Sequence, residues 1–195
     1  MCGRFYVDEK MVQEIRSIIR DVDRRLKLPI VGEVGPSDSS LIIHGGVERV
    51  LGTDAMQWGF RQKSGSGLII NARAESVTER PMFRESILLR RCVIPSSWFY
   101  EWNQNKEKVT FKKGDSSVLY MAGFYQRYED GNRFVILTTG ANKSMKPVHD
   151  RMPVILEGQE LQDWVFDESY MKYVLNRVPT ELNREQDYEQ QSFVF

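Results

Sequence analysis

The amino-terminal residues Met1-Cys2-Gly3-Arg4 carry the most reactive chemistry in the chain. If Met1 is removed, Cys2 presents an α-amine and a thiol on adjacent carbons, and both groups are partly nucleophilic near neutral pH. Such a 1,2-aminothiol can attack a thioester, an amide or an aldehyde, and with an aldehyde it closes a five-membered thiazolidine. Gly3 leaves the approach open, and Arg4 could hold an anion beside the nucleophile. Taken alone, an incidental cysteine in a frayed chain start is the commoner explanation, so other residues must decide.

Two polar residues follow an apolar run at a spacing that suggests a shared site. Asn71 and Arg73 come directly after Leu68-Ile69-Ile70 and are two positions apart. Side chains two apart point to the same side of an extended chain. The pair would therefore present an amide and a guanidinium fork suited to phosphate.

A carboxylate and an imidazole offer proton transfer. Glu101 lies inside the aromatic run Trp98–Trp102, where desolvation would raise its pKa and suit it to moving protons near neutral pH. A glutamate on the solvent face of a strand is an equally frequent explanation. His149 comes shortly before Arg151 and an apolar strand, although a lone histidine is more often structural than catalytic.

Taken in order, six short motifs resemble those of the abasic-site-processing family, also called the SOS-response-associated peptidase family. The resemblance runs from Met1 to about Trp164, and each motif is weak alone while six in order are specific. The motifs are Met1-Cys2-Gly3-Arg4-Phe5, Trp58-Gly59, Asn71-Ala72-Arg73-Ala74-Glu75, Arg91-Cys92-Val93-Ile94-Pro95, Phe99-Tyr100-Glu101-Trp102 and His149-Asp150-Arg151-Met152-Pro153.

This resemblance implies that mature Cys2 reacts with the ring-opened aldehyde of an abasic site in single-stranded DNA. The α-amine would form a Schiff base at C1′, and the thiolate would close the thiazolidine. Asn71 would orient the amino terminus or the sugar, while Glu101 and His149 would carry protons. The resemblance also implies lyase and thiol autopeptidase activities.

The same resemblance implies where DNA would bind. Arginines would contact the phosphates, a loop proline would shape the site and tryptophans would contact the DNA. The implied DNA-binding residues are Arg4, Arg73, Arg151, Pro36, Trp58 and Trp102. We expect no metal and no cofactor, no membrane partner, a monomer, and a cytoplasmic protein that associates with the nucleoid when on DNA.

The sequence departs from the family pattern at three places. Glu33 stands where the family usually has an asparagine, three residues before Pro36, and Trp98 stands where it usually has a glycine. The loop at 61–67 contains only polar and glycine residues, whereas some members carry aromatic residues there that wedge against bases. This composition argues against base stacking at the loop.

Two other classes of function remain open. Met-Cys-Gly also begins class II glutamine amidotransferases, in which the amine serves as base for the thiol, although their further motifs are not found here. A non-covalent reader of modified or single-stranded DNA would use a basic body and tryptophans. A glutaminase assay separates the first from the crosslinking protein, and a denaturing gel separates the second, because a reader leaves no adduct.

Composition indicates a globular protein in one domain spanning 1–195. Hydrophobic residues make up 41% of the 195 residues, and no apolar run is long enough to cross a membrane or to act as a signal core. The two cysteines, Cys2 and Cys92, suggest neither a disulfide framework nor a metal site. The net charge is zero, but residues 157–195 are acidic and the rest is basic, which fits either a positive groove or ordinary charge scatter.

Hydrophobic spacing predicts short strands with peripheral helices, that is, an α+β fold, mostly β, around a curved or barrel-like sheet. Asp8 is the predicted N-cap of the first helix, and loops are expected at 32–40 and 61–67. Helices are predicted at 8–26, 82–89, 159–166 and 168–174. Strands are predicted at 41–43, 47–51, 55–60, 68–70, 91–102, 109–111, 118–125, 134–139 and 153–156.

Overall fold

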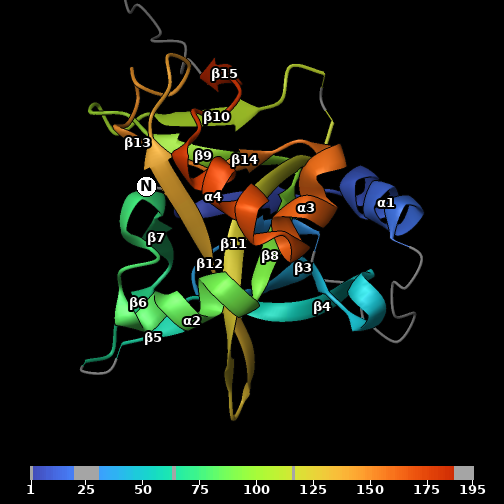
Figure 1. The fold of residues 1–195 in the computed structure, drawn as a ribbon. Coiled ribbons are helices and arrows are strands. Elements are labelled where there is room, and N and C mark those ends of the chain that lie inside the picture. Colours follow the sequence, from blue (N-terminus) through green and yellow to red (C-terminus); the bar gives the residue numbers. More distant parts are fainter. Residues whose placement is uncertain (1, 20–30, 63–64, 116, 187–195) are drawn as a thin grey trace, which may run out of the picture.

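The computed structural model describes residues 2–19, 31–62, 65–115 and 117–186 (Figure 1). Its main elements are two sheets, in which most strand pairs are antiparallel, and four α-helices. The smaller sheet has five strands in the order β15-β10-β9-β1-β2. Its strands are β1 (Arg4–Val7), β2 (Gly32–Val34), β9 (Trp98–Trp102), β10 (Lys108–Lys112) and β15 (Asn183–Gln186).

The larger sheet follows the order β13-β12-β4-β3-β8-β11-β14, and β7 adds to it by pairing with β12. A separate two-stranded piece joins β5 (Phe60–Arg61) to β6 (Leu68–Ile69). The long β11–β12 hairpin projects below the rest of the molecule in Figure 1. The strands of the larger sheet are β3 (Ser39–Gly45), β4 (Leu51–Trp58), β7 (Asn71–Arg73), β8 (Arg91–Ser96), β11 (Leu119–Tyr128), β12 (Gly131–Gly140), β13 (Arg151–Pro153) and β14 (Ile155–Leu156).

The helices lie around these sheets, and α3 packs against β8. None of the helices in the described part of the chain is long and apolar enough to cross a bilayer. The α-helices are α1 (Glu9–Ile18), α2 (Pro81–Leu89), α3 (Leu161–Phe166) and α4 (Glu168–Asn176). The short 3₁₀ turns are η1 (Val47–Arg49), η2 (Ala74–Ser76) and η3 (Gly158–Glu160).

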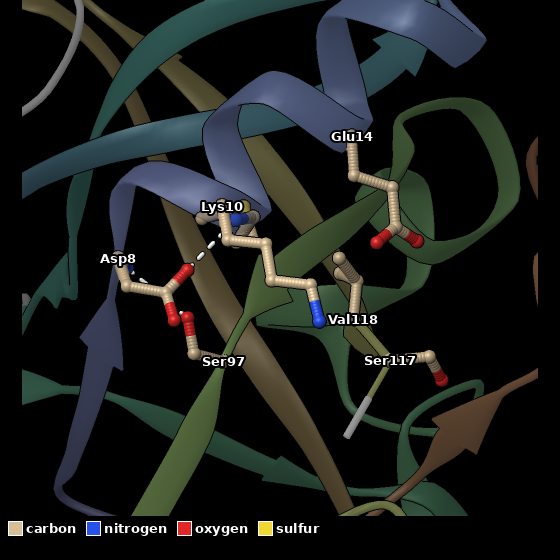
Figure 2. A pocket seen from close by; sticks show the side chains of 7 residues that line it. Asp8, Lys10, Glu14, Ser97, Ser117 and Val118 are labelled. Carbon is tan, nitrogen blue, oxygen red and sulfur yellow. Dashed lines mark hydrogen bonds between the residues drawn. The ribbon is translucent and has the colours of Figure 1, made fainter. Parts of the chain in front are cut away.

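The start of α1 is tied to the link between β8 and β9. Asp8 caps the helix, because its Oδ1 accepts a 2.7 Å hydrogen bond from the N–H of Met11. The N–H of Asp8 donates to Ser97 Oγ at 3.0 Å, and the N–H of Ser97 donates to the carbonyl of Tyr6 at 2.8 Å. Figure 2 shows Asp8 and Ser97 facing each other beside a small pocket. These bonds fix the end of β1 that leads away from Cys2.

Aromatic side chains from both sheets form part of the core. Trp58 is completely buried, stacks with Phe134 at a centroid distance of 6.0 Å and contacts the Phe5 ring at 5.2 Å. Its indole N–H donates to the carbonyl of Ile70 at 2.9 Å. Trp58 was expected to contact DNA, but in this fold its ring is fully buried and offers no exposed surface for such a contact.

The predicted α+β class with mostly strands is confirmed, while several boundaries differ. Helix α1 begins after Asp8 as predicted but ends at Ile18, and Ile19 is already extended. The rest of the predicted 8–26 helix lies outside the described residues. The predicted strand at 91–102 is two strands in different sheets, broken at Ser97.

Three other segments also depart from expectation. The predicted loop at 32–40 contains β2 and the start of β3, and β15 was not predicted at all. The predicted strands at 41–43 and 47–51 correspond to the antiparallel pair of β3 and β4, but residues 47–49 form η1 before β4 starts at Leu51. Within the predicted 61–67 loop, residues 63 and 64 lie outside the described part of the chain.

Candidate functional site

Strand pairing brings Glu101 next to the beginning of the chain. In the β1–β9 pair, Arg4 lies opposite Tyr100 and Phe5 opposite Phe99. The residue after Tyr100 is Glu101, which is therefore carried alongside the end of β1 that leads back to Cys2. Glu101 is buried, with 4% of its surface exposed, between the buried Tyr100 and the exposed Trp102.

The Cys2 thiol is buried and held mainly in its protonated form. Burial, followed by the negative charge of Glu101, raises the pKa of Cys2 far above its usual range. Its S–H lies 3.9 Å from the carbonyl of Arg4, a weak contact. The thiol therefore needs a base to become nucleophilic, and Glu101 is the carboxylate whose charge it senses.

Asn71 reaches Cys2 from the other sheet. Its side-chain N–H donates a 3.0 Å hydrogen bond to the backbone carbonyl of Cys2. Strand β7 holds Asn71 in place by pairing in parallel with β12, where Asn71 lies opposite Ile136. The Oδ1 of Asn71 is buried and accepts no hydrogen bond from any described residue. It can therefore accept one from a group bound at the site.

His149 lies at the entrance to β13 in a defined ring state. The backbone N–H of Arg151 donates to His149 Nδ1 at 2.9 Å. A nitrogen that accepts a hydrogen bond carries no proton, so the neutral ring holds its proton on Nε2. The N–H of His149 also donates to the carbonyl of Met145 at 3.1 Å, which closes the loop before the strand.

The Arg151 guanidinium is held by protein groups. Its two terminal nitrogens donate to the two carboxylate oxygens of Glu75 at 2.7 and 2.9 Å. One of them also donates to the carbonyl of Thr138 at 2.6 Å. Arg151 was expected to contact phosphate, and in this arrangement such a contact requires the fork to leave Glu75.

The other expected DNA contacts differ in their availability. Arg4 is paired with Glu33, whose carboxylate also lies 4.0 Å from the ammonium of Lys108. Arg73 is exposed and its guanidinium makes no hydrogen bond or ion pair with any residue that the structure describes. Trp102 is 42% exposed on the face of β9 opposite Glu101, and Pro36 is also exposed.

Sequence reasoning brought Cys2, Asn71 and Glu101 to one site, but it gave no role to Glu75 or Thr138. The pattern that could have found Glu75 is its place in the Asn71–Glu75 motif, two residues after Arg73. No group of histidine, cysteine or carboxylate side chains within the described ranges is arranged to hold a metal ion.

The sequence is similar to a known protein family and to several of its members. The family model for SOS response associated peptidase (SRAP) matches residues 1–189. The chain is 34% identical to the abasic site processing protein YoqW of Bacillus subtilis, over 85% of this chain and 80% of that protein. It is 30% identical to the abasic site processing protein HMCES of Xenopus tropicalis, over 60% of this chain and 45% of that protein.

The fold is shared with solved structures. A crystal structure of a protein from Bacteroides thetaiotaomicron superposes with a TM-score of 0.80, covering 96% of this chain and 93% of that one. The two sequences are 22% identical. The likeness is therefore one of fold.

Proposed function

The chain belongs to the SOS response associated peptidase (SRAP) family, and on that basis we propose that it senses abasic sites in single-stranded DNA and captures them covalently. The nucleophile is Cys2 after removal of Met1. The adduct is a thiazolidine, and it shields the lesion. No cofactor enters the reaction.

The proposed reaction uses the α-amine and the thiol of Cys2 and the C1′ aldehyde of the abasic site. The Cys2 α-amine adds to the C1′ aldehyde and gives a carbinolamine, which loses water to form an imine. The thiol then loses its proton, its sulfur bonds to the imine carbon, and the nitrogen takes up a proton. The product is a five-membered ring, and the net change is the loss of one water.

The observation that best supports this proposal is that Asn71, from the larger sheet, and Glu101, from the smaller sheet, both lie close to Cys2. Asn71 fixes the Cys2 carbonyl at 3.0 Å, which limits rotation of the residue that must present both amine and thiol. Glu101 provides the negative charge that the buried thiol senses and is the base that takes its proton. His149, with its proton on Nε2, is the acid–base group for opening the sugar ring.

The neighbouring surface suits a single strand. Arg73 offers a phosphate a guanidinium that is unpaired among the residues the structure describes, and the exposed Trp102 ring offers a stacking surface for a base. A complementary strand would compete for that ring, so intact duplex should be a poor substrate. The proposal extends to strand scission through the imine and to release of Met1 by the Cys2 thiol, with the protein acting as a monomer.

The direct test is the intact mass of the protein after incubation with single-stranded DNA that contains one abasic site. We expect a species that survives a denaturing gel, with the summed mass of the two molecules less one water. Cys2→Ala should lose the stable adduct and keep at most an imine that borohydride traps. Cys92→Ala is the matched control and should crosslink normally.

Two outcomes would overturn the proposal. A stable adduct mapped to Cys92 would remove Cys2 from its role. Binding without any adduct, by a protein whose Met1 is shown to be absent, would favour a non-covalent reader, and glutamine hydrolysis in the same preparation would favour an amidotransferase.

A further inference from the structure

Glu75 occupies a position that connects three strands around His149. It lies in η2, directly after β7, and its carboxylate reaches Arg151 in β13. Strand β12 runs between these two strands, with Thr138 opposite both Arg73 and Pro153. The Arg151 fork bonds Glu75 on one side and the carbonyl of Thr138 on the other.

Arg151 is thus held through both its side chain and its backbone. Its side chain is held by Glu75 and Thr138, and its backbone N–H donates to His149 Nδ1 at 2.9 Å. Movement of the guanidinium would loosen the first residue of β13. That residue supplies the donor which keeps the His149 proton on Nε2.

We infer that Glu75 is a positioning residue for His149: by clamping Arg151 it holds the imidazole in the Nε2–H tautomer and in its place at the head of β13. The inference rests on the proposed function, in which His149 is the acid–base group that opens the sugar. It assigns to Glu75 a role in the chemical step and none in binding the DNA.

The geometry explains why a carboxylate is needed at this position. A two-point bond to an arginine fork requires two acceptors, and a carboxylate supplies both with a full charge. The hydrogen bonds from Arg151 lower the pKa of Glu75, against the smaller opposing effect of burial, so the pair persists at neutral pH. A glutamine would turn its NH₂ group toward an Arg151 donor and lose one of the two bonds.

The chain provides its own reference for the ring state. It contains two histidines, His44 and His149. His44 Nδ1 lies 3.0 Å from the carbonyl of Gly45, so it carries the proton, opposite to His149. Two-bond ¹⁵N–¹H spectra of the free protein separate these tautomers. We expect the His149 Nε2–H pattern in the wild type and an averaged or shifted pattern in Glu75→Gln, with the His44 pattern unchanged.

Kinetics test the consequence. At saturating abasic single-stranded DNA, Glu75→Gln should slow adduct formation about tenfold while the Kd stays within about threefold. Glu75→Asp, which keeps the charge, should recover part of the rate. An open-chain aldehyde substrate should remove most of the defect, because it bypasses opening of the sugar. Glu79→Gln is the control, since this exposed carboxylate makes no bond to another described residue.

The outcomes separate the two proposals. If the wild type forms no adduct, the proposed function fails, and the spectra of the free protein still decide whether Glu75 sets the ring state. An unchanged His149 pattern in Glu75→Gln overturns the inference. So does tighter DNA binding at an unchanged rate, which would make Glu75 a competitor of phosphate. Should Glu75→Gln not fold, Arg151→Lys removes the fork while keeping the charge and must show the same spectral change.

Discussion

Asn71 and Cys2 are 69 residues apart in the chain, yet the Asn71 side-chain amide donates a 3.0 Å hydrogen bond to the Cys2 carbonyl. Cys2 lies just before β1 of the smaller sheet, whereas Asn71 begins β7 of the larger one. The bond therefore joins the two sheets at the point where the proposed nucleophile lies.

Asn71→Ala should reduce both crosslinking and stability. Loss of one partly buried hydrogen bond costs about 1 kcal/mol of unfolding free energy. Misplacement of the amine by about 1 Å can cost up to about 100-fold in rate. Rates at saturating DNA and urea unfolding measure the two effects. The control is Asn132→Ala. Asn132 lies on the projecting β11–β12 hairpin and donates a hydrogen bond to Asp54 of β4, so losing this bond should change the crosslinking rate little. Equal crosslinking rates for Asn71→Ala and Asn132→Ala would show that Asn71 has no role in the reaction.

Arg73 should contribute more to DNA binding than Arg4. The Arg73 guanidinium is unpaired among described residues, whereas Arg4 is paired with Glu33 and must leave it to meet a phosphate. We expect a shallow overall salt dependence, from about two to four phosphate contacts at ~0.7 each. Arg73→Ala should lower the slope of log K against log salt by about 0.7.

Arg4→Ala should lower that slope by less, and Glu33→Gln should strengthen binding slightly by releasing Arg4. Arg16→Ala, on the exposed side of α1, is the control. Fluorescence anisotropy between about 50 and 200 mM salt gives the slopes. A larger effect at Arg4 than at Arg73 would reverse the assignment.

Two tryptophans should separate binding from folding. Trp102 is 42% exposed, and stacking of one base on an aromatic ring is worth about 1–3 kcal/mol. Trp102→Ala should therefore weaken single-strand binding while the Tm changes little. Trp58→Ala should instead destabilise the protein by about 3–5 kcal/mol, because the ring is fully buried. A strong effect of Trp102→Ala on stability with none on binding would contradict this division.

The contrast between these two residues shows what the sequence could and could not predict. The order of the family motifs grouped Cys2, Asn71 and Glu101, and the structure brings these three residues close together, with Asn71 in β7 and Glu101 in β9. Trp58 belonged to the same kind of motif, but its burial depends on Phe5 and Phe134, which come from distant strands. Local pattern carries no information about such contacts.

Element boundaries failed for a related reason. Residues 91–102 are mostly apolar and β-prone, so the sequence pattern predicted one strand, whereas the chain turns at Ser97 and passes from one sheet to the other. The turn is stabilised because Ser97 Oγ accepts a hydrogen bond from the N–H of Asp8 and the N–H of Ser97 donates to the carbonyl of Tyr6, both far away in sequence. The Glu75–Arg151 pair was likewise hidden, because 76 residues separate its members.

Alkaline pH should destabilise the protein through Cys92. Burial raises the pKa of its thiol well above the ordinary value of 9.0. The unfolded chain then loses the proton at lower pH than the folded one, so this stability is present below about pH 9 and is lost as the pH rises further. The decline approaches about 1.4 kcal/mol per pH unit for one thiol.

Cys92→Ala should therefore lower the Tm at pH 7, because it leaves a small cavity, but flatten the fall of Tm between pH 8 and 10. Differential scanning calorimetry over that interval measures both. Parallel curves for wild type and variant would show that Cys92 does not contribute to the alkaline loss.

Glu101 and His149 should fail at different steps of capture. Glu101 is the charge sensed by the Cys2 thiol, so it is the proposed carrier for closing and reopening the thiazolidine. His149, with its proton on Nε2, is the proposed carrier for opening the sugar. Removing one general acid–base group costs about 10²–10⁴-fold in rate. Glu101→Gln and His149→Ala should both slow crosslinking while DNA affinity stays within a few-fold of wild type.

The substrate distinguishes the two roles. An open-chain aldehyde needs no ring opening, so it should rescue His149→Ala far more than Glu101→Gln. Closing and reopening share one transition state, so Glu101→Gln should also slow release of a preformed adduct, as followed by transfer to a competing aminothiol. Quenched time courses on both substrates give the rates. Equal rescue, or none for either variant, would refute the division of labour and leave two residues that share a site.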